Sequence, residues 1–104
     1  MNIIAVYITA KDADEARRLG QLLLEKRLVA CVNIVENISS SYLWRGVIQH
    51  EQEALLIAKT RQALFPQVKR LVKENHSYDV PCINALPVLD SDESYSKWVY
   101  QETK

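Results

Sequence analysis

The sequence predicts an α+β fold: a ferredoxin-like β-α-β-β-α-β sandwich with a long hairpin between its second and third strands and a short C-terminal helix. Two observations support this prediction. Strand-like and helix-like segments follow one another in this order, and one of only two glycines lies at a turn between two long strand-like segments. No linker divides the 104 residues, so we expect one domain over residues 1–104.

The first half of the chain has the pattern strand, helix, strand. Residues 3–8 are rich in β-branched and aromatic side chains, which favours a strand. Asp12 can cap a helix that runs to about Arg27, because apolar residues then recur on one helical face. Residues 28–35 return to the composition of a strand.

A hairpin is predicted around Arg45 and Gly46. Glycine tolerates the positive φ that tight hairpin turns require. Tyr42 and Trp44 stand just before the turn, and the return strand over residues 47–60 is longer than an average strand.

The second half repeats the order with a helix and an edge strand. Pro66 fits only the first turn of a helix that ends near Asn75. Residues 82–86 form the last predicted strand, which should lie at an edge because Pro87 has no N–H to donate.

A short helix is expected at the C-terminus. Asp90 with Glu93 three residues later resembles a capping box. The helix it would open carries Tyr95 and Trp98.

The predicted strands are apolar at nearly every position. In a two-layer sandwich the helices cover only one sheet face, so a second apolar face requires another cover. A second copy of the chain is the simplest cover, and the protruding hairpin offers edges for pairing between subunits. We therefore predict a homo-oligomer.

Composition excludes several classes of protein. The chain has 13 Lys+Arg, 13 Asp+Glu and 48% hydrophobic residues, as in a globular domain of zero net charge. Nucleic acid is not expected as a partner, because that binding draws on clustered cations. No apolar run approaches the roughly 20 residues of a membrane span, and the N-terminus opens into a strand without a leader pattern. We expect a cytoplasmic protein with no membrane partner.

No catalytic signature is evident, so we predict a protein that is not an enzyme. The chain contains neither G-x-S-x-G nor H-E-x-x-H. Cys31 and Cys82 lack zinc or redox spacing and lie in apolar runs, which indicates buried thiols. His50 lies among polar residues and is expected to be solvated.

A series of motifs runs through nearly the whole chain: ACVNI at 30–34, SYLWRG at 41–46, KT at 59–60, HSYDVP at 76–81 and YSKW at 95–98, with Ile48 and Glu53. Together they closely resemble the CutA divalent-cation-tolerance family. The resemblance implies a protomer related to the PII signalling proteins, assembled as a homotrimer through hairpins that here contain Tyr42, Trp44 and Gly46. It also implies a role in tolerance of copper and other divalent ions, with no required cofactor.

The chain departs from the family pattern at positions that matter for metal binding. The usual His-Pro-Tyr-Glu-x-Pro-Glu reads HSYDVPC over residues 76–82. The resemblance implies copper ligands from a Cys at the end of the first strand and from a pair of His before the Pro-Tyr. Those positions hold Ile8, Asn75 and His76, so one of three ligands remains.

His76, Asp79 and Cys82 are a candidate metal site. They follow one another at spacings of three residues and offer imidazole, carboxylate and thiolate donors. Soft sulfur with imidazole suits copper or zinc. The alternative is that His76 only caps the end of the second main helix.

A ligand cleft at the subunit boundary is the second candidate site. The resemblance implies that it gathers Lys59, Thr60, His76, Tyr78, Tyr95 and Trp98. One cation, hydroxyl donors and aromatic walls would suit an anionic or planar ligand, unless the aromatic residues serve only to pack an interface. Two functions follow: a metal-binding trimer in divalent-cation tolerance, or a PII-like small-ligand sensor or stable trimeric scaffold with incidental metal binding.

Overall fold

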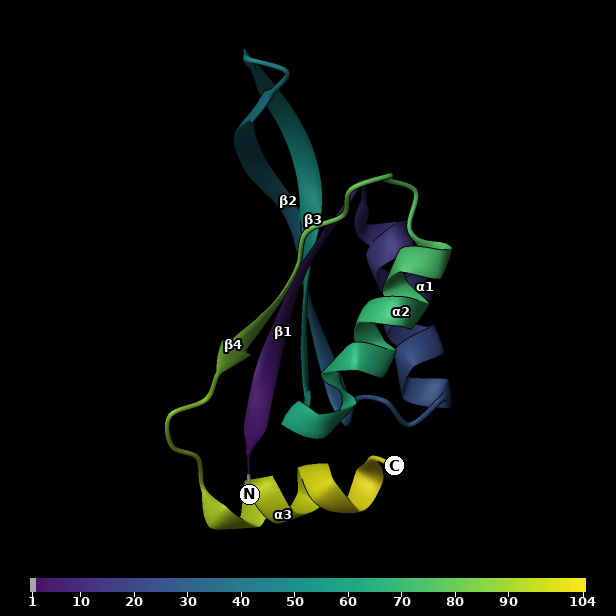
Figure 1. Ribbon diagram of the computed structural model, residues 1–104, viewed down its shortest axis with the longest axis vertical. Helices are drawn as coiled ribbons and strands as arrows, with labels where there is room; N and C mark the ends of the chain where they lie inside the picture. The colour runs from purple at the N-terminus through teal and green to yellow at the C-terminus, as the bar shows by residue number, and fades with distance from the viewer. Residues whose placement is uncertain (1) are drawn as a thin grey trace.

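The computed structural model describes residues 2–104 as four strands and three α-helices (Figure 1). Along the chain these are β1 (Ile3–Ala10), α1 (Ala13–Glu25), β2 (Cys31–Trp44), β3 (Val47–Arg61), a 3-10 turn (Gln62–Leu64), α2 (Phe65–Asn75), β4 (Ile83–Pro87) and α3 (Glu93–Glu102). The strands form one antiparallel sheet in the order β2-β3-β1-β4. This order confirms the predicted ferredoxin-like sandwich.

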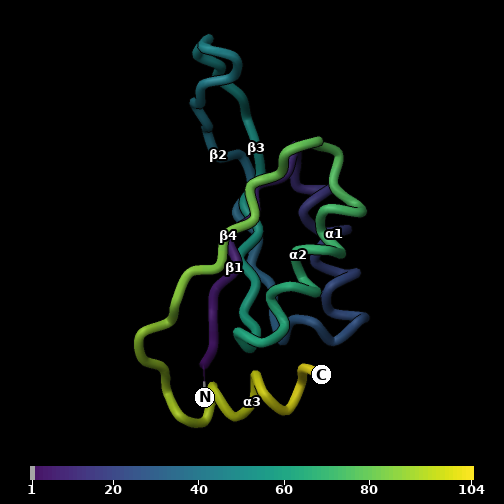
Figure 2. Tube along the Cα trace, viewed as in Figure 1, coloured from purple at the N-terminus to yellow at the C-terminus, as the bar shows by residue number. Residues whose placement is uncertain are grey.

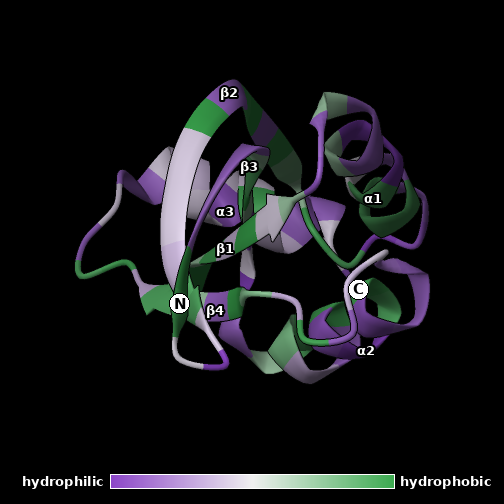
Figure 3. Cartoon of the chain, turned by 90° about the horizontal axis from the view of Figure 1, so that it is seen from above, coloured by the Kyte–Doolittle hydropathy of each residue, from purple (hydrophilic) through white to green (hydrophobic). Residues whose placement is uncertain are grey.

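The two main helices lie together against one face of the sheet (Figure 3). Side chains of β1 alternate accordingly: Ile4, Val6 and Ile8 are buried under the helices, while Ala5 and Tyr7 on the other face are only half-buried. We call this second face the open face of the sheet. Its apolar residues are the ones for which a cover is predicted.

Local signals place α1 as expected. The Oδ1 atom of Asp12 accepts a hydrogen bond of 2.8 Å from the backbone N–H of Glu15, which confirms the predicted N-cap. The helix ends at Glu25, two residues before Arg27, whose φ of 55° turns the chain away. Gly20 allows α1 to approach β2, because an added Cβ would lie 3.1 Å from Val32.

The hairpin of β2 and β3 extends well beyond the rest of the molecule (Figure 2). The whole molecule, hairpin included, measures 44 × 26 × 22 Å. Arg45 and Gly46 have φ of 52° and 81°, as the predicted tight turn requires. From the sequence, the first arm is predicted to contain a strand over residues 28–35, followed by Tyr42 and Trp44 just before the turn. In the structure β2 is one strand from Cys31 to Trp44. A bulge shifts its register with β3 between Val35 and Ile38, and pairing continues on both sides of the bulge.

The C-terminal half confirms one local prediction and corrects another. β4 is an edge strand, as predicted, and it runs from Ile83 to Pro87, one residue later than the predicted range 82–86. The predicted cap at Asp90 is wrong. The α3 helix starts later, and Asp92 accepts the capping hydrogen bond of 3.0 Å from the N–H of Tyr95. Asp90 instead accepts from the N–H of Ser91.

Within residues 2–104, none of the helices is long and apolar enough to cross a membrane.

Candidate functional site

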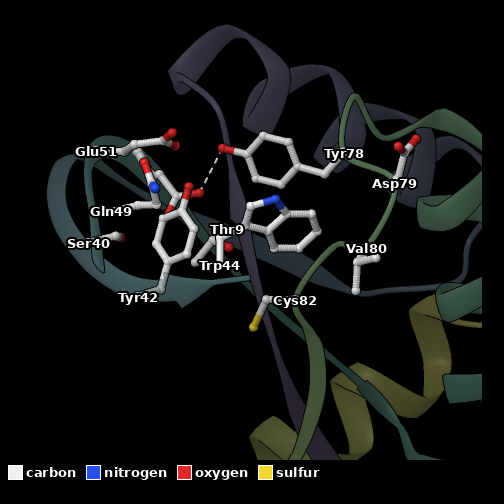
Figure 4. A pocket seen from close by; sticks show the side chains of 11 residues that line it. Thr9, Ser40, Tyr42, Trp44, Gln49, Glu51, Tyr78, Asp79, Val80 and Cys82 are labelled. Carbon is white, nitrogen blue, oxygen red and sulfur yellow. Dashed lines mark hydrogen bonds between the residues drawn. The ribbon is translucent and has the colours of Figure 1, made fainter. Parts of the chain in front are cut away.

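A cleft of about 610 Å³ lies between the hairpin and the segment that leads into β4 (Figure 4). Three aromatic rings, three carboxylates and one thiol line it. The lining residues are Thr9, Ser40, Tyr42, Trp44, Gln49, Glu51, Glu53, Tyr78, Asp79, Val80 and Cys82. We call this hollow the acidic cleft, because no Lys, Arg or His belongs to its lining within the described part of the chain.

The hairpin contributes one of its two faces to the acidic cleft. Strand register pairs Tyr42 with Gln49 and Ser40 with Glu51, so these side chains share a face. Glu53 lies two residues beyond Glu51 on β3 and therefore points the same way. The alternation of the two glutamates thus places both carboxylates in the cleft.

The other wall is held in place by His76, which follows the last residue of α2. Its Nε2 lies 2.8 Å from the carbonyl oxygen of Thr9, and its Nδ1 lies 3.0 Å from the backbone nitrogen of Tyr78. A carbonyl can only accept and an N–H can only donate, so the ring carries its proton on Nε2. Both nitrogens are therefore used inside the chain, and their partners lie in β1 and in the segment after α2. His76 stands at the C-cap position, but these two contacts of its ring are not to the free carbonyls of the helix, which the capping alternative predicts.

The buried carboxylate of Glu15 holds the same segment, which follows α2, through hydrogen bonds. Glu15 is only 3% exposed and accepts hydrogen bonds from the N–H of Lys11 and from the N–H and hydroxyl of Ser77. Burial raises the pKa of Glu15, but these hydrogen bonds and the nearby His76 outweigh burial, so its pKa lies below the ordinary value. The charged carboxylate thus ties the start of α1 to the segment after α2.

Glu53 is the most enclosed carboxylate of the cleft. The residue is 8% exposed, and it accepts a hydrogen bond of 2.8 Å from the hydroxyl of Tyr78. Burial, followed by this hydrogen bond, raises the pKa of the Tyr78 phenol, so the hydroxyl stays protonated. In the described residues, none of Glu51, Glu53 and Asp79 forms an ion pair with a Lys or Arg.

The three predicted metal ligands do not converge within one chain. Asp79 and Cys82 line the cleft, but their side chains point in different directions in Figure 4, and His76 is engaged elsewhere. Burial, and then the charge of Glu53, raises the pKa of the Cys82 thiol. Residues 2–104 contain no group of three or more His, Cys, Asp or Glu side chains arranged to hold a metal ion.

The six predicted cleft residues fall into separate groups within one chain. His76 and Tyr78 lie beside Thr9 at the hairpin end of the sheet. Lys59 pairs with Ala5, which precedes Thr9 by four residues on β1. Lys59 therefore lies about 13 Å from Thr9 along the strand direction. Thr60 points to the opposite, helix-covered face, where its hydroxyl donates to the carbonyl of Leu28.

Tyr95 and Trp98 accompany Lys59 at the far end of the open face. The hydroxyl of Tyr95 lies 3.2 Å from the sulfur of Cys31, which is the cross-strand partner of Lys59. The rings of Tyr95 and Trp98 are 5.7 Å apart between centroids. We call this group the α3 end of the open face, in contrast to the hairpin end that carries the acidic cleft. Neither Cys31 nor Cys82 is fully buried, contrary to the prediction.

Sequence reasoning did not assign Glu51, Glu53 or Glu15 to a site. Glu51 and Glu53 are two residues apart on a predicted strand, so their side chains must share one face of it. This spacing could have predicted that the two carboxylates lie together. Glu15 has no such signal, because its partner Ser77 is 62 residues away in sequence.

Comparison with known proteins identifies the family. The family model for the CutA1 divalent ion tolerance protein matches residues 4–102. The divalent-cation tolerance protein CutA of Thermus thermophilus is 42% identical over 98 residues, which cover 94% of this chain and 95% of that protein. The CutA protein of Pyrococcus horikoshii is 41% identical over 102 residues, covering 98% of this chain and 99% of that protein.

Solved structures agree. CutA1 from Oryza sativa has a TM-score of 0.96 at 39% identity, with 100% of this chain and 95% of that chain covered. The Thermus thermophilus protein has a TM-score of 0.96 at 40% identity, with coverage of 98% and 99%. The chain spans only 56% of the chloroplastic CutA of Arabidopsis thaliana, with which it is 40% identical. The chain belongs to the CutA divalent ion tolerance family.

Proposed function

We propose that this protein acts as a homotrimer in the response to divalent cations and that the acidic cleft binds the cation, copper or another divalent metal. One observation carries the proposal: Glu53 is almost fully enclosed, yet within residues 2–104 its carboxylate has no ion pair and accepts a hydrogen bond from the neutral phenol of Tyr78. Several homologues are named as divalent-cation tolerance proteins, which is consistent with a cation as ligand.

Electrostatics favour a cation in this cleft. A buried carboxylate is costly unless a positive charge or several hydrogen bonds compensate it. Glu51 and Asp79 add negative charge to the same space, and no lining residue supplies a positive one within the described part of the chain. A bound cation would supply that compensation.

The donor atoms suit a partly hydrated metal ion. Glu51 and Glu53 lie on one face of β3 and can share an ion, with water completing its coordination. The thiol of Cys82 has a raised pKa, so a metal must displace its proton before the sulfur can bind. Among divalent ions, Cu²⁺ is expected to bind such a mixed site most tightly.

Exposed apolar residues support self-association. At the tip of the hairpin Leu43 and Ile48 are 70% and 64% exposed, and Trp44 stands between them in sequence. Val35 and Leu86 add apolar surface to the open face of the sheet. Such surface is costly in water and marks a contact between copies. Analytical ultracentrifugation should give three times the 12.0 kDa of one chain, and a stable monomer would contradict the trimer.

Calorimetric titration with Cu²⁺, Zn²⁺ and Mn²⁺ tests the metal site. We expect at least one saturable site with a Kd below about 10 μM, near −7 kcal/mol. Glu53→Gln should weaken it at least about tenfold, because a charged ligand and its buried charge are both lost. His50→Ala on the outer hairpin is the matched control for surface adsorption. Equal losses in the two variants, or no saturable binding, would overturn the metal proposal.

A small-ligand sensor is the second candidate. The volume of about 610 Å³ and the three aromatic rings favour it, because both are typical of pockets for organic molecules.

A further inference from the structure

We propose that the acidic cleft binds an organic ammonium cation, enclosed by aromatic rings and carboxylates. The rings belong to Tyr42, Trp44 and Tyr78, and the carboxylates to Glu51 and Glu53. The inference rests on the proposed attraction of this cleft for cations and names the chemical class of its ligand.

The size of the cleft exceeds the needs of a single ion. Its volume of about 610 Å³ falls within the range of roughly 300–1,000 Å³ that is typical of organic ligands, whereas one water occupies about 30 Å³. Its carboxylates are also too dispersed to form a three-ligand metal cluster within residues 2–104. A larger cation would fill the space and reach several acids at once.

The rings provide the walls that such a cation requires. Figure 4 shows the side chains of Tyr42, Trp44 and Tyr78 around one space. The face of an aromatic ring carries negative potential and attracts cations, most strongly for tryptophan. Trp44 already draws a positive group within its own chain, since the guanidinium carbon of Arg45 lies 5.8 Å from its ring centroid.

Each tyrosine of the cleft is coupled to a carboxylate. The Tyr78 hydroxyl donates to Glu53 across 2.8 Å. A hydrogen bond to Glu51 holds the pKa of the Tyr42 phenol above its ordinary value, so this hydroxyl too stays protonated and beside a charged acid. A cation against either ring is therefore close to a negative charge.

An alkylated ammonium would contact both the rings and the carboxylates, whereas a divalent metal ion would use the oxygen and sulfur donors alone. Ring faces cannot replace the oxygen ligands of a small divalent cation. A quaternary ammonium has no N–H to satisfy and carries a weakly hydrated charge, so aromatic walls with nearby carboxylates meet its needs.

Titration by nuclear magnetic resonance tests the inference with tetramethylammonium chloride as the probe. The indole N–H of Trp44 reports on the cleft, and that of Trp98 at the α3 end is an internal reference. We expect a saturable shift at Trp44 and none at Trp98, at constant ionic strength. The neutral isostere tert-butanol should bind at least about tenfold more weakly, because it lacks the charge.

Charge-removing variants separate attraction from simple apolar contact. Glu53→Gln and Glu51→Gln should each weaken tetramethylammonium binding about three- to tenfold, with Glu25→Gln on exposed α1 surface as the unchanged control. Glu51 is exposed, so Glu51→Gln decides the matter if Glu53→Gln fails to fold. Equal binding of tert-butanol, or no effect of either substitution, would overturn the inference.

The metal titration distinguishes this inference from the proposed function. If Cu²⁺ binds at the cleft and tetramethylammonium does not shift Trp44, the ammonium inference falls while the metal proposal stands. If tetramethylammonium binds and no metal gives a saturable site, the metal proposal falls and the ammonium inference stands.

Discussion

The two ends of the open sheet face carry opposite charges and are built in different ways. At the hairpin end, Glu51 and Glu53 face a segment held by buried polar contacts of His76 and Glu15. At the α3 end, Lys59 lies beside two aromatic residues that are more than a third exposed. The same strands run through both ends.

The contrast shows where preorganisation comes from. At the hairpin end, Glu15 and His76 take part in five hydrogen bonds. The carboxylate of Glu15 accepts three of them and is almost fully buried. At the α3 end, the side-chain hydrogen bonds are exposed: the hydroxyl of Tyr95 lies 3.2 Å from the sulfur of Cys31, and Lys59 donates to the side chain of Asn33. Buried polar networks fix geometry because each broken bond leaves an unpaired group, whereas exposed groups can turn to water instead. We therefore expect substitutions to have graded effects.

Glu15→Ala should have the largest effect. It leaves the N–H groups of Lys11 and Ser77 without their acceptor, which should lower the free energy of unfolding by about 2–4 kcal/mol. Urea unfolding measures this loss. The contact between Tyr78 and Glu53 should loosen as well, while the resonance of Trp98 stays in place. An equal disturbance of Trp98 would show that the two ends are not independent.

Trp44→Ala should have the next largest effect, on assembly. Truncation of a large aromatic residue at a contact between copies costs about 2–4 kcal/mol. We expect a lower subunit mass by ultracentrifugation at micromolar concentration and a lower melting temperature. Trp98→Ala at the α3 end is the comparison. An unchanged mass for Trp44→Ala would place the subunit contact elsewhere.

The fold could be predicted because its signals are local. The Asp12 cap, the Arg45-Gly46 turn and the edge position of Pro87 each depend on residues close in sequence. The mistake at Asp90 is also local. Three acidic residues, including Asp92, stand near the start of α3, and the residue pattern did not show which of them meets the first free N–H groups.

The site was harder to predict because it depends on contacts across the chain. His76 and Thr9 are 67 residues apart, and Glu15 and Ser77 are 62 apart. Their pairing follows from how α1 and α2 pack on the sheet, which no motif spacing encodes. The predicted cleft residues were grouped without knowledge of the strand register. The register places Lys59 opposite Ala5, about 13 Å along the sheet from Thr9.

Acid should weaken the hairpin end before the α3 end. The folded pKa of Glu15 lies below the ordinary value of 4.5, so the charged carboxylate stabilises the fold above that pH. This stabilisation is lost as the pH falls below 4.5 through the folded pKa. Melting temperatures measured downward from neutral pH should drop in this window, and the drop should shrink in Glu15→Gln. A drop of the same size in that variant would assign it to other carboxylates.

The smallest effect is expected at the α3 end, in alkali. Burial, and then the hydrogen bond with Cys31, raises the pKa of Tyr95 to about 12. A raised phenol pKa stabilises the fold fully below the ordinary value of 10.0, and this contribution is lost as the pH rises through about 12. Cys31→Ala removes only the second cause, so tyrosinate absorbance should show Tyr95 ionising slightly earlier, with the unfolding free energy changed by less than about 1 kcal/mol. The signal is isolated by comparison with Tyr95→Phe. A large loss of stability in Cys31→Ala would show that the α3 end is as tightly built as the hairpin end, and the contrast between them would fail.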